Sequence, residues 1–245
     1  MKKVFLSAGF FLAFIMLSYT LDEKESLPEW FLPLREAVYE QVLGAEEVYQ
    51  VYEGVLAKTN ELSGAGRFSL SSHCEYLMGR AYQYFKNEKK AIEHYQKGYD
   101  EALQSLKIKE SAEGRTYLAE NLSQLCTLKN TIWVMAHGLD VEKFSKQALN
   151  LDPRAVKAQY MIASRWIYAP SPFSDIPKGL QMMKDILNGD YHIEKDDLFN
   201  LYVSLAYGNI KEKQKELARQ WIDKALSVYP GNQFAGVELL SDLVQ

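Results

Sequence analysis

The stretch Met78–Tyr82 (Met-Gly-Arg-Ala-Tyr), together with Ala91–Tyr95 (Ala-Ile-Glu-His-Tyr), decides the fold of this chain of 245 residues. Gly79 and Ala91 lie twelve residues apart, a step typical of two antiparallel helices joined by a short turn. The distance between packed helices depends on the side chains at their contact, so small residues at both points let the helices approach closely. We therefore predict a helical hairpin whose helices cross at Gly79 and Ala91.

Similar spacing recurs along the chain. Ala206 and Ala218 repeat the twelve-residue step, and segments 147–153 and 224–230 both end a helical pattern with Ala-Leu followed by a proline. Repetition of a unit of roughly 34 residues is typical of helical-repeat proteins, in which helix pairs stack side by side. The chain is long enough for about five to seven such pairs.

One unit, which contains Ala119, is longer than this spacing allows. Its excess is about ten residues over the usual period, and residues 120–136 are rich in helix formers. We therefore expect its first helix to run about two or three extra turns, until His137 and Gly138 end it.

The loops and the end of the stack also have sequence signals. Another unit has four extra residues, which we place in 169–175, where two prolines break the helix. Ser174 or Asp175 then caps the next helix. Segment 63–66 (Ser-Gly-Ala-Gly) predicts a loop. Residues 233–244 are apolar on one face, as expected of a terminal helix that covers the open end of a stack.

The first residues have the pattern of an export signal. Lys2 and Lys3 form a basic start, and Val4–Leu17 form an apolar segment of the length found in secretory signals. The predicted signal peptide covers residues 1–20, and we expect an exported protein, in the periplasm of a bacterial cell envelope. An uncleaved anchor is the alternative, because Val4–Leu21 is only just long enough to span a bilayer.

On its repeated units, the chain resembles tetratricopeptide-repeat (TPR) proteins from about residue 30 to residue 245. The resemblance implies an all-α fold: a right-handed superhelical stack of antiparallel helix pairs, a TPR-like α-solenoid, with a C-terminal capping helix. It divides the chain into a degenerate N-terminal helix pair at 28–62 and a repeat domain with its capping helix at 67–245.

A narrower resemblance is to the periplasmic TPR partner of TRAP-type solute transporters. It is based on the exported start, on the long unit after Gly114–Ala119, and on the helix break at Tyr168–Pro170. The lipid-attachment cysteine expected of that family is missing from this chain.

Composition limits the remaining classes of function. Hydrophobic residues make up 47% of the chain and charged residues 24%, a balance that argues against long disorder. The formal net charge is -4 and no long run of like charges occurs, so we predict no nucleic-acid partner. Cys74 and Cys126 either pair in an oxidising compartment or remain two buried thiols.

The sequence carries no recognisable catalytic constellation. The four histidines are scattered, and neither a His-Glu-x-x-His spacing, nor paired Cys-x-x-Cys, nor a phosphate-binding glycine loop occurs. The adjacent His73, Cys74 and Glu75 would point in different directions on a helix. We interpret Asp196 and Asp197 as acidic charge at a helix N-terminus. We predict no enzyme activity, no cofactor and no metal site.

In a stack of helix pairs, the first helices line a concave groove. Tyrosine offers a rigid contact area with a polar end, which suits a recognition surface, although any one tyrosine has the alternative of packing between repeats. Spacing from the small residues places the following side chains in the groove, which we predict to bind a polar peptide or a small charged solute: Tyr76, Arg80, Tyr84, Glu120, Gln124, Lys157, Tyr160, Ser164, Tyr168 and Tyr207.

The sequence therefore predicts an exported, non-enzymatic TPR scaffold that binds a protein or peptide partner in its groove. The alternative, implied by the narrower resemblance, is an accessory ligand-handling subunit of a TRAP-type transporter, with a membrane transporter subunit as partner. Contact with a membrane is expected only through an uncleaved signal anchor. An oligomer is left open.

Overall fold

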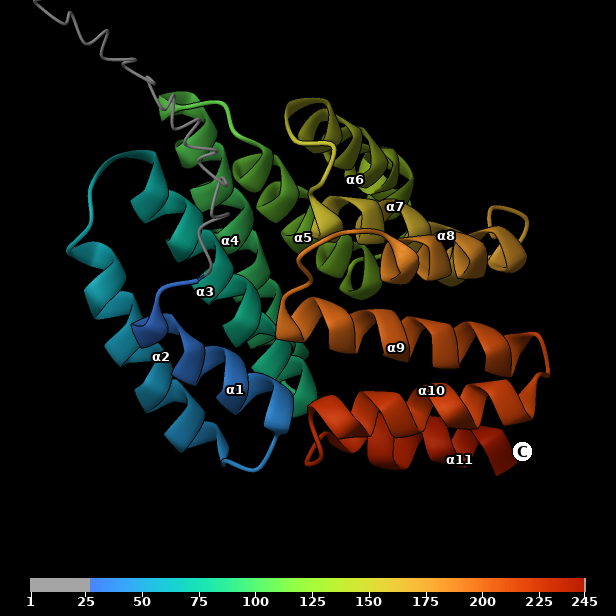
Figure 1. Ribbon diagram of the computed structural model, residues 1–245. Helices are drawn as coiled ribbons and strands as arrows, with labels where there is room; N and C mark the ends of the chain where they lie inside the picture. The colour runs from blue at the N-terminus through green and yellow to red at the C-terminus, as the bar shows by residue number, and fades with distance from the viewer. Residues whose placement is uncertain (1–26, 245) are drawn as a thin grey trace, which may run out of the picture.

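The computed structural model describes residues 27–244, and this part of the chain is all-helical and has no strand (Figure 1). A 3-10 turn, η1 (Glu29–Phe31), comes first, and a π-helical turn, η2 (Phe234–Glu238), comes before the last helix. The α-helices are α1 (Leu32–Glu40), α2 (Ala45–Asn60), α3 (Gly64–Tyr84), α4 (Glu88–Ile108), α5 (Ala112–Leu128), α6 (Thr131–Leu151), α7 (Val156–Tyr168), α8 (Ile176–Asn188), α9 (Lys195–Lys211), α10 (Lys215–Val228) and α11 (Leu239–Val244).

Consecutive helices pack in neighbouring pairs, α3 with α4, α5 with α6, α7 with α8 and α9 with α10. The first helix of each pair also contacts the first helix of the next pair, so that α3, α5, α7 and α9 lie side by side. The predicted all-α architecture of paired helices is confirmed. We call the surface formed by α3, α5, α7 and α9 the inner face.

Small residues lie where the paired helices cross, as predicted. A Cβ atom added to Gly79 on α3 would lie 2.6 Å from the ring of Tyr95 on α4, closer than real Cβ atoms come. Ala91, Ala206 and Ala218 are fully buried. Close packing at these positions fixes the separation of α3 from α4 and of α9 from α10.

The long unit was predicted wrongly. Helix α5 ends at Leu128, and the extra residues belong to the second helix, α6, which runs through His137 and Gly138. The Asn130 side chain accepts a hydrogen bond from the backbone N–H of Trp133 at 3.0 Å and so caps α6. A helix tolerates an interior glycine at a cost of about 1 kcal/mol, so Gly138 does not end α6.

The predicted break at 169–175 is confirmed. Helix α7 ends at Tyr168, and α8 begins after Asp175, whose side chain accepts a hydrogen bond from Lys178 N at 3.2 Å. The predicted loop at 63–66 is wrong, because α3 begins at Gly64. Gly64 has a φ of +68°, which glycine adopts without strain, and this sharp turn lets the helix start directly after Ser63.

The largest hydrophobic core joins the two ends of the described chain. It contains Phe31, Leu34 and Tyr39 from η1 and α1, and Phe199 and Tyr229 from α9 and the end of α10. The predicted terminal helix is present as η2 and α11, which pack on α10 and α9. The predicted segments 28–62 and 67–245 therefore share one core.

The predicted signal peptide at residues 1–20 lies outside the described residues. Between residues 27 and 244, no helix has both the length and the apolar character that crossing a membrane requires.

Candidate partner-binding site

The inner face carries a buried group of charges, which we call the central charge cluster: Lys157 on α7, Glu120 on α5, and Asp196 and Asp197 in the first turn of α9. Lys157 Nζ lies 3.3 Å from Glu120 Oε1, 3.2 Å from Asp196 Oδ2 and 2.7 Å from Asp197 Oδ1. All three carboxylates are buried. One ammonium therefore holds the N-terminal half of α7 to both α5 and α9.

The pKa values of the four groups in the cluster are shifted in different directions. Burial alone would raise the pKa values of Asp196 and Glu120, but the charge of Lys157, with His73, outweighs it and both pKa values lie below the usual range. Burial and the neighbouring Asp196 raise the pKa of Asp197 to about 6, although Lys157 opposes this shift. Burial would lower the pKa of Lys157, yet the three carboxylates hold it well above its ordinary value. Lys157 thus remains charged, whereas Asp197 changes charge in mildly acidic solution.

Aromatic rings border the cluster. The ring of His73 stacks on Phe31, Tyr76 and Tyr117 at centroid distances of 5.3, 5.9 and 4.8 Å. His73 Nδ1 lies 3.6 Å from Glu120 Oε2, and neither atom has a hydrogen-bond partner within residues 27–244. His73 therefore joins α3 to α5 mainly by stacking.

Helix α1 packs against α3 and reaches the start of α9 with its polar side chains. Arg35 Nη1 lies 3.2 Å from Glu194 Oε2 and 3.6 Å from Asp196 Oδ1. Tyr39 is buried, its hydroxyl accepts a hydrogen bond from Asn200 Nδ2 at 2.9 Å, and its ring stacks on Tyr229 at 5.2 Å. In this way α1 covers the end of the inner face where the central charge cluster lies.

The chain after α10 holds the far end of α1. Asn232 Nδ2 donates to Tyr39 O at 2.7 Å, and Gly231 N donates to Glu40 Oε2 at 3.0 Å. Gln233 N donates to Gln41 Oε1 at 2.7 Å. These contacts join residues about 190 positions apart in the sequence, so the array of helices is closed at this side by its own N-terminal helix (Figure 1).

The other end of the inner face is formed by tyrosines. The hydroxyls of Tyr160 and Tyr168 lie 3.1 and 3.0 Å from Ser204 Oγ, which is fully buried on α9. Tyr168 stacks on Tyr207 at 5.0 Å and is 46% exposed. Lys211 Nζ lies over the ring of Tyr207, 5.0 Å from its centroid. This tyrosine cluster joins α7 to α9 and stays accessible.

The structure therefore brings the predicted site residues together in two groups. Glu120 and Lys157 meet in the central charge cluster, beside Tyr76 and Arg80, and Tyr160, Tyr168 and Tyr207 meet in the tyrosine cluster. The remaining three are partly exposed, and within the described chain no hydrogen bond, ion pair or ring contact joins their side chains to the other predicted residues: Tyr84, Gln124 and Ser164.

Several residues of the site were not predicted. Asp196 and Asp197 do lie at a helix N-terminus, but their burial against Lys157 has no signal in the local sequence. Arg35, Tyr39 and Ser204 were not singled out, because their contacts depend on how helices far apart in the chain are placed.

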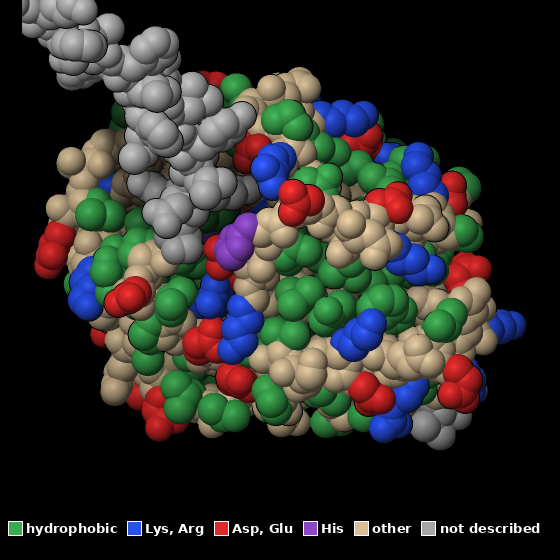
Figure 2. Space-filling view, in the orientation of Figure 1, with side chains coloured by type: hydrophobic (Ala, Val, Ile, Leu, Met, Phe, Trp, Pro, Cys, Tyr) green, Lys and Arg blue, Asp and Glu red, His purple; other side chains and the backbone are tan. Residues whose placement is uncertain are grey.

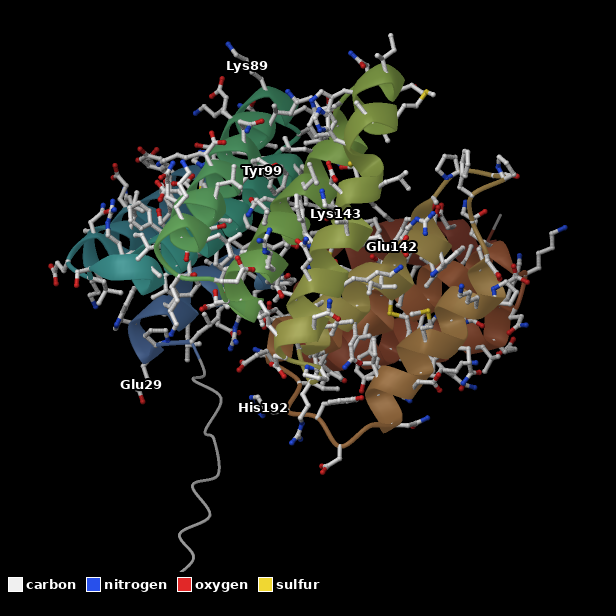
Figure 3. The ribbon with its side chains drawn as sticks, turned by 90° about the horizontal axis from the view of Figure 1, so that it is seen from above. Glu29, Lys89, Tyr99, Glu142, Lys143 and His192 are labelled. Carbon is white, nitrogen blue, oxygen red and sulfur yellow. The ribbon has the colours of Figure 1, made fainter. Side chains whose placement is uncertain are left out.

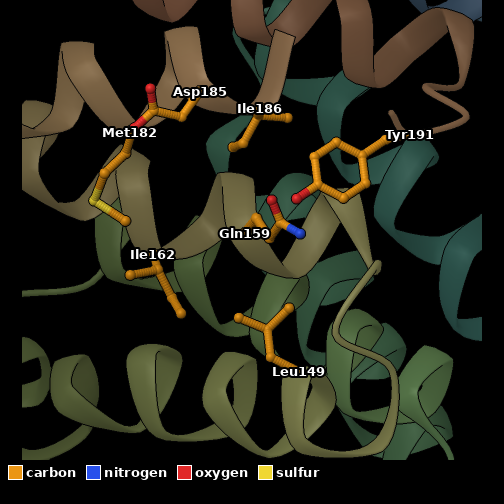
Figure 4. Close-up of a pocket in the computed structure, with 7 residues that line it drawn as sticks. All are labelled: Leu149, Gln159, Ile162, Met182, Asp185, Ile186 and Tyr191. Atoms are coloured by element: carbon orange, nitrogen blue, oxygen red, sulfur yellow. The ribbon is translucent and has the colours of Figure 1, made fainter. Parts of the chain in front are cut away.

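A small pocket lies between the end of α6, α7 and α8 (Figure 4). Its volume is about 210 Å³, below the range of pockets that take drug-sized ligands. None of the predicted site residues lines it. The lining is mostly apolar, with Gln159, Asp185 and the ring of Tyr191 at its edge.

Other polar groups have structural partners. Glu75 is buried and accepts from Tyr52 Oη at 2.7 Å, with His94 Nδ1 at 2.7 Å and Lys97 Nζ at 2.6 Å, so it ties α3 to α2 and α4. His73 and Glu75 thus face different neighbours, as predicted. Cys74 and Cys126 are free thiols. No group of three or more metal-ligand side chains is arranged around a common point in residues 27–244.

The surface of the molecule has a mixed character. Hydrophobic side chains gather over the region of α8 and α9, with acidic and basic side chains around them (Figure 2). Tyr202 of α9 stacks on Trp221 of the next helix, α10, at a centroid distance of 5.7 Å. His192, in the connection between α8 and α9, projects at the edge of the molecule, remote from Lys89 and Tyr99 on α4 (Figure 3).

A scan against models of protein families found no match, and a search of curated protein sequences found none either. We therefore infer the function from the geometry of the inner face.

Proposed function

We propose that this chain is an exported, non-enzymatic scaffold of the tetratricopeptide-repeat type, a right-handed superhelical stack whose inner face binds a helical segment of a protein partner. One observation carries the proposal: α1, itself a helix, packs against the inner helix α3 and reaches α9 through Arg35 and Tyr39. A surface that holds one amphipathic helix has the shape and chemistry to hold another.

The attachment of α1 has the features of an exchangeable contact. Helix α1 has only nine residues, too few to be stable in water alone, so its helical form depends on docking. The connection to α2, residues 41–44, contains Gln41 with a φ of 57° and Val42, which is 71% exposed. The contact between α1 and α9 combines the buried ring pair of Tyr39 and Phe199 with ion pairs and a hydrogen bond from Arg35 and Tyr39, and water can replace these polar contacts when the helices separate.

The side chains of α1 indicate what the inner face recognises. Phe31, which ends η1 and directly precedes α1, is spaced by four residues from Arg35, and Arg35 by four from Tyr39, so the three side chains lie on one side. Phe31 stacks on His73, Arg35 pairs with Glu194 and Asp196, and Tyr39 bonds to Asn200. A partner helix with an aromatic, a basic and an aromatic side chain at this spacing fits the same contacts.

The tetratricopeptide type is supported by the pairwise packing and by Gly79, Ala91, Ala206 and Ala218 at the helix crossings. The basic and apolar pattern of residues 1–20 supports export, and we propose the periplasm as the compartment.

A second candidate is an accessory subunit that handles a small ligand for a TRAP-type transporter. One observation favours it: Arg80 is a half-buried cation on the inner face that has no carboxylate within 4 Å in residues 27–244. Such a group suits a small charged solute as well as a polypeptide.

Capture of partners from cell envelopes separates the two candidates. The bait proteins are the wild type, the double variant Glu194→Gln and Asn200→Ala, which removes side-chain contacts to Arg35 and Tyr39 of α1, and Ile108→Ala at the exposed end of α4 as control. Native mass spectrometry of wild type and control should show one stoichiometric protein partner that the double variant loses. A co-purified transporter subunit would favour the second candidate, and equal capture by all three baits would contradict an inner-face site.

A further inference from the structure

The pocket between the end of α6, α7 and α8 lies on the other side of α7 from the inner face. Gln159 and Ile162 of α7 line it, and they follow Lys157 and Tyr160 by two residues each. Two steps along an α-helix turn through about 200°. Because Lys157 and Tyr160 contact the inner helices α5 and α9, the pocket is separate from the inner face. An occupant of this pocket goes beyond the proposed function.

The walls of the pocket are apolar and come from three helices. Leu149 of α6, Ile162 of α7, and Met182 and Ile186 of α8 surround a common space (Figure 4). Leu149, Ile162 and Met182 are only half-buried, so an apolar group between them would remove their side chains from water and add dispersion contacts. The volume of about 210 Å³ compares with roughly 150 Å³ for an engineered apolar cavity that binds benzene. The pocket therefore has room for one ring or one short branched chain.

Two of the polar lining residues are held by contacts next to the pocket. The ring of Tyr191 packs on Gly189, the residue directly after α8, so closely that an added Cβ atom at Gly189 would collide with the ring. The Nε2 of Gln159 donates to the carbonyl oxygen of Pro153 at 2.9 Å. Within residues 27–244 this leaves the Oε1 of Gln159 as an acceptor without a partner. The site is therefore formed in advance of binding, as is usual for small-molecule pockets.

The edge of the pocket carries one carboxylate, Asp185, across the pocket from Leu149 (Figure 4). Its Oδ1 accepts a hydrogen bond from Gln181 Nε2 at 2.8 Å, one turn earlier on α8. In the part of the chain that the structure describes, Asp185 forms no ion pair. A carboxylate only accepts hydrogen bonds, and it attracts positive charge. The polar end of a matching ligand therefore donates hydrogen bonds and is cationic.

We propose that this pocket binds a primary amine with a single apolar ring or a short branched chain, its body between Leu149, Ile162 and Met182 and its ammonium group at Asp185. The amine is either a free small molecule or the N-terminal residue of a peptide, when that residue is apolar. A carboxylic acid of the same shape would be repelled by Asp185. Because the pocket lies between the pairs α5–α6 and α7–α8, the bound amine stabilises their packing.

An NMR titration of the isotope-labelled full chain tests the site with paired probes. Benzylamine and its neutral analogue benzyl alcohol represent a small amine, and the peptide Phe-Ala-Ala with a free and with an acetylated N-terminus represents a chain end. At least one ammonium probe should bind about two- to fivefold more tightly than its neutral partner, as expected for a charge pair at a partly exposed site. Its chemical-shift changes should centre on the pocket. The pair that shows the difference identifies the source of the amine.

The variants separate the charge of the site from its apolar space. Asp185→Asn should lose about two- to fivefold in affinity for the amine and should bind the neutral probe as wild type does. Ile162→Phe fills the pocket and should abolish binding of both, and Met182→Phe serves in its place if circular dichroism shows that the first variant is unfolded. The control is Asp223→Asn, which removes an exposed carboxylate of α10 and should leave binding unchanged.

Four results would overturn the site: equal affinity for charged and neutral probes in both pairs, benzoate that binds as tightly as benzylamine, unchanged amine affinity in Asp185→Asn or in the filled pocket, or shift changes confined to residues remote from the pocket. Any of these would leave the scaffold untouched, because envelope capture tests the contacts of α1 with α9 and not this pocket.

Discussion

Lys157 Nζ on α7 lies 2.7 Å from Asp197 Oδ1 in the first turn of α9, and both groups are enclosed by the inner face. Asp196 and Glu120 also lie within 4 Å of the same ammonium. Three carboxylates around one cation leave an excess of negative charge, which a proton on Asp197 relieves. This relationship makes the link between α5, α7 and α9 dependent on charge.

Replacing Lys157 by methionine should lower the free energy of unfolding by about 3–5 kcal/mol, because it leaves buried carboxylates without a counter-charge. Urea unfolding followed by circular dichroism measures the loss. Lys143→Met is the matched control, since Lys143 pairs with Asp140 at an exposed site on α6, and its effect should stay within about 0.5 kcal/mol. A loss below about 1 kcal/mol for Lys157→Met would show that the cluster is solvated.

The free energy of unfolding of the variant Asp197→Asn should rise relative to that of wild type as pH rises. The folded-state pKa of Asp197 is about 6, above the ordinary 3.8, so its contribution to stability is present below the lower value and is lost as pH rises through the higher one. The difference between variant and wild type should therefore shift by up to about 3 kcal/mol between about pH 4 and pH 7. Urea unfolding across this range gives the curve, and a constant difference would contradict the raised pKa.

Gly79→Ala should destabilise the α3–α4 pair by about 1–3 kcal/mol, because the new methyl group would meet the ring of Tyr95. The opposite result is expected for Gly138→Ala in α6, where the nearest atom, Val134 Cγ1, lies 3.5 Å from the added Cβ. There the gain in helix propensity should stabilise by up to about 1 kcal/mol. Thermal unfolding of the two variants measures both effects. A Gly79→Ala protein as stable as wild type would contradict the requirement for glycine at this helix crossing.

Asn130→Ala should fray the first turn of α6 and cost about 0.5–2 kcal/mol, because it removes the side chain that caps the helix. Hydrogen exchange is the appropriate measurement, since faster exchange is expected at residues 131–134 and not in α5. Thr127→Ala is the control, because that hydroxyl bonds only the carbonyl of Gln124 inside α5. Equal exchange in Asn130→Ala and wild type would mean that α6 does not depend on this cap.

Sequence predicted those features that depend on nearby residues. The crossings at Gly79 and Ala91 follow from a spacing of twelve residues, and the Asp175 cap follows from the prolines before it. The boundary between α5 and α6 was missed because helix formers lie on both sides of it and one asparagine, Asn130, makes the difference.

Contacts between distant residues were beyond such reasoning. Glu120 and Lys157 were placed on one face by their positions on first helices, and they do meet. The pairing of Arg35 with Asp196 joins residues 161 positions apart, and it depends on how far the whole array curves. No local pattern carries that information, so the covering of the inner face by α1 was not predicted.

We propose that the inner face binds a helix and that α1 is its resident occupant. A protease site inserted in residues 41–44 allows α1 to be cut from α2 in the folded protein, and fluorescence anisotropy then follows exchange with a labelled peptide of residues 27–43. The peptide should bind to the cut protein, and its Arg35→Gln version should bind at least about tenfold more weakly, since it loses the pairs with Glu194 and Asp196. No binding of the wild-type peptide, or equal binding of both peptides, would contradict the account.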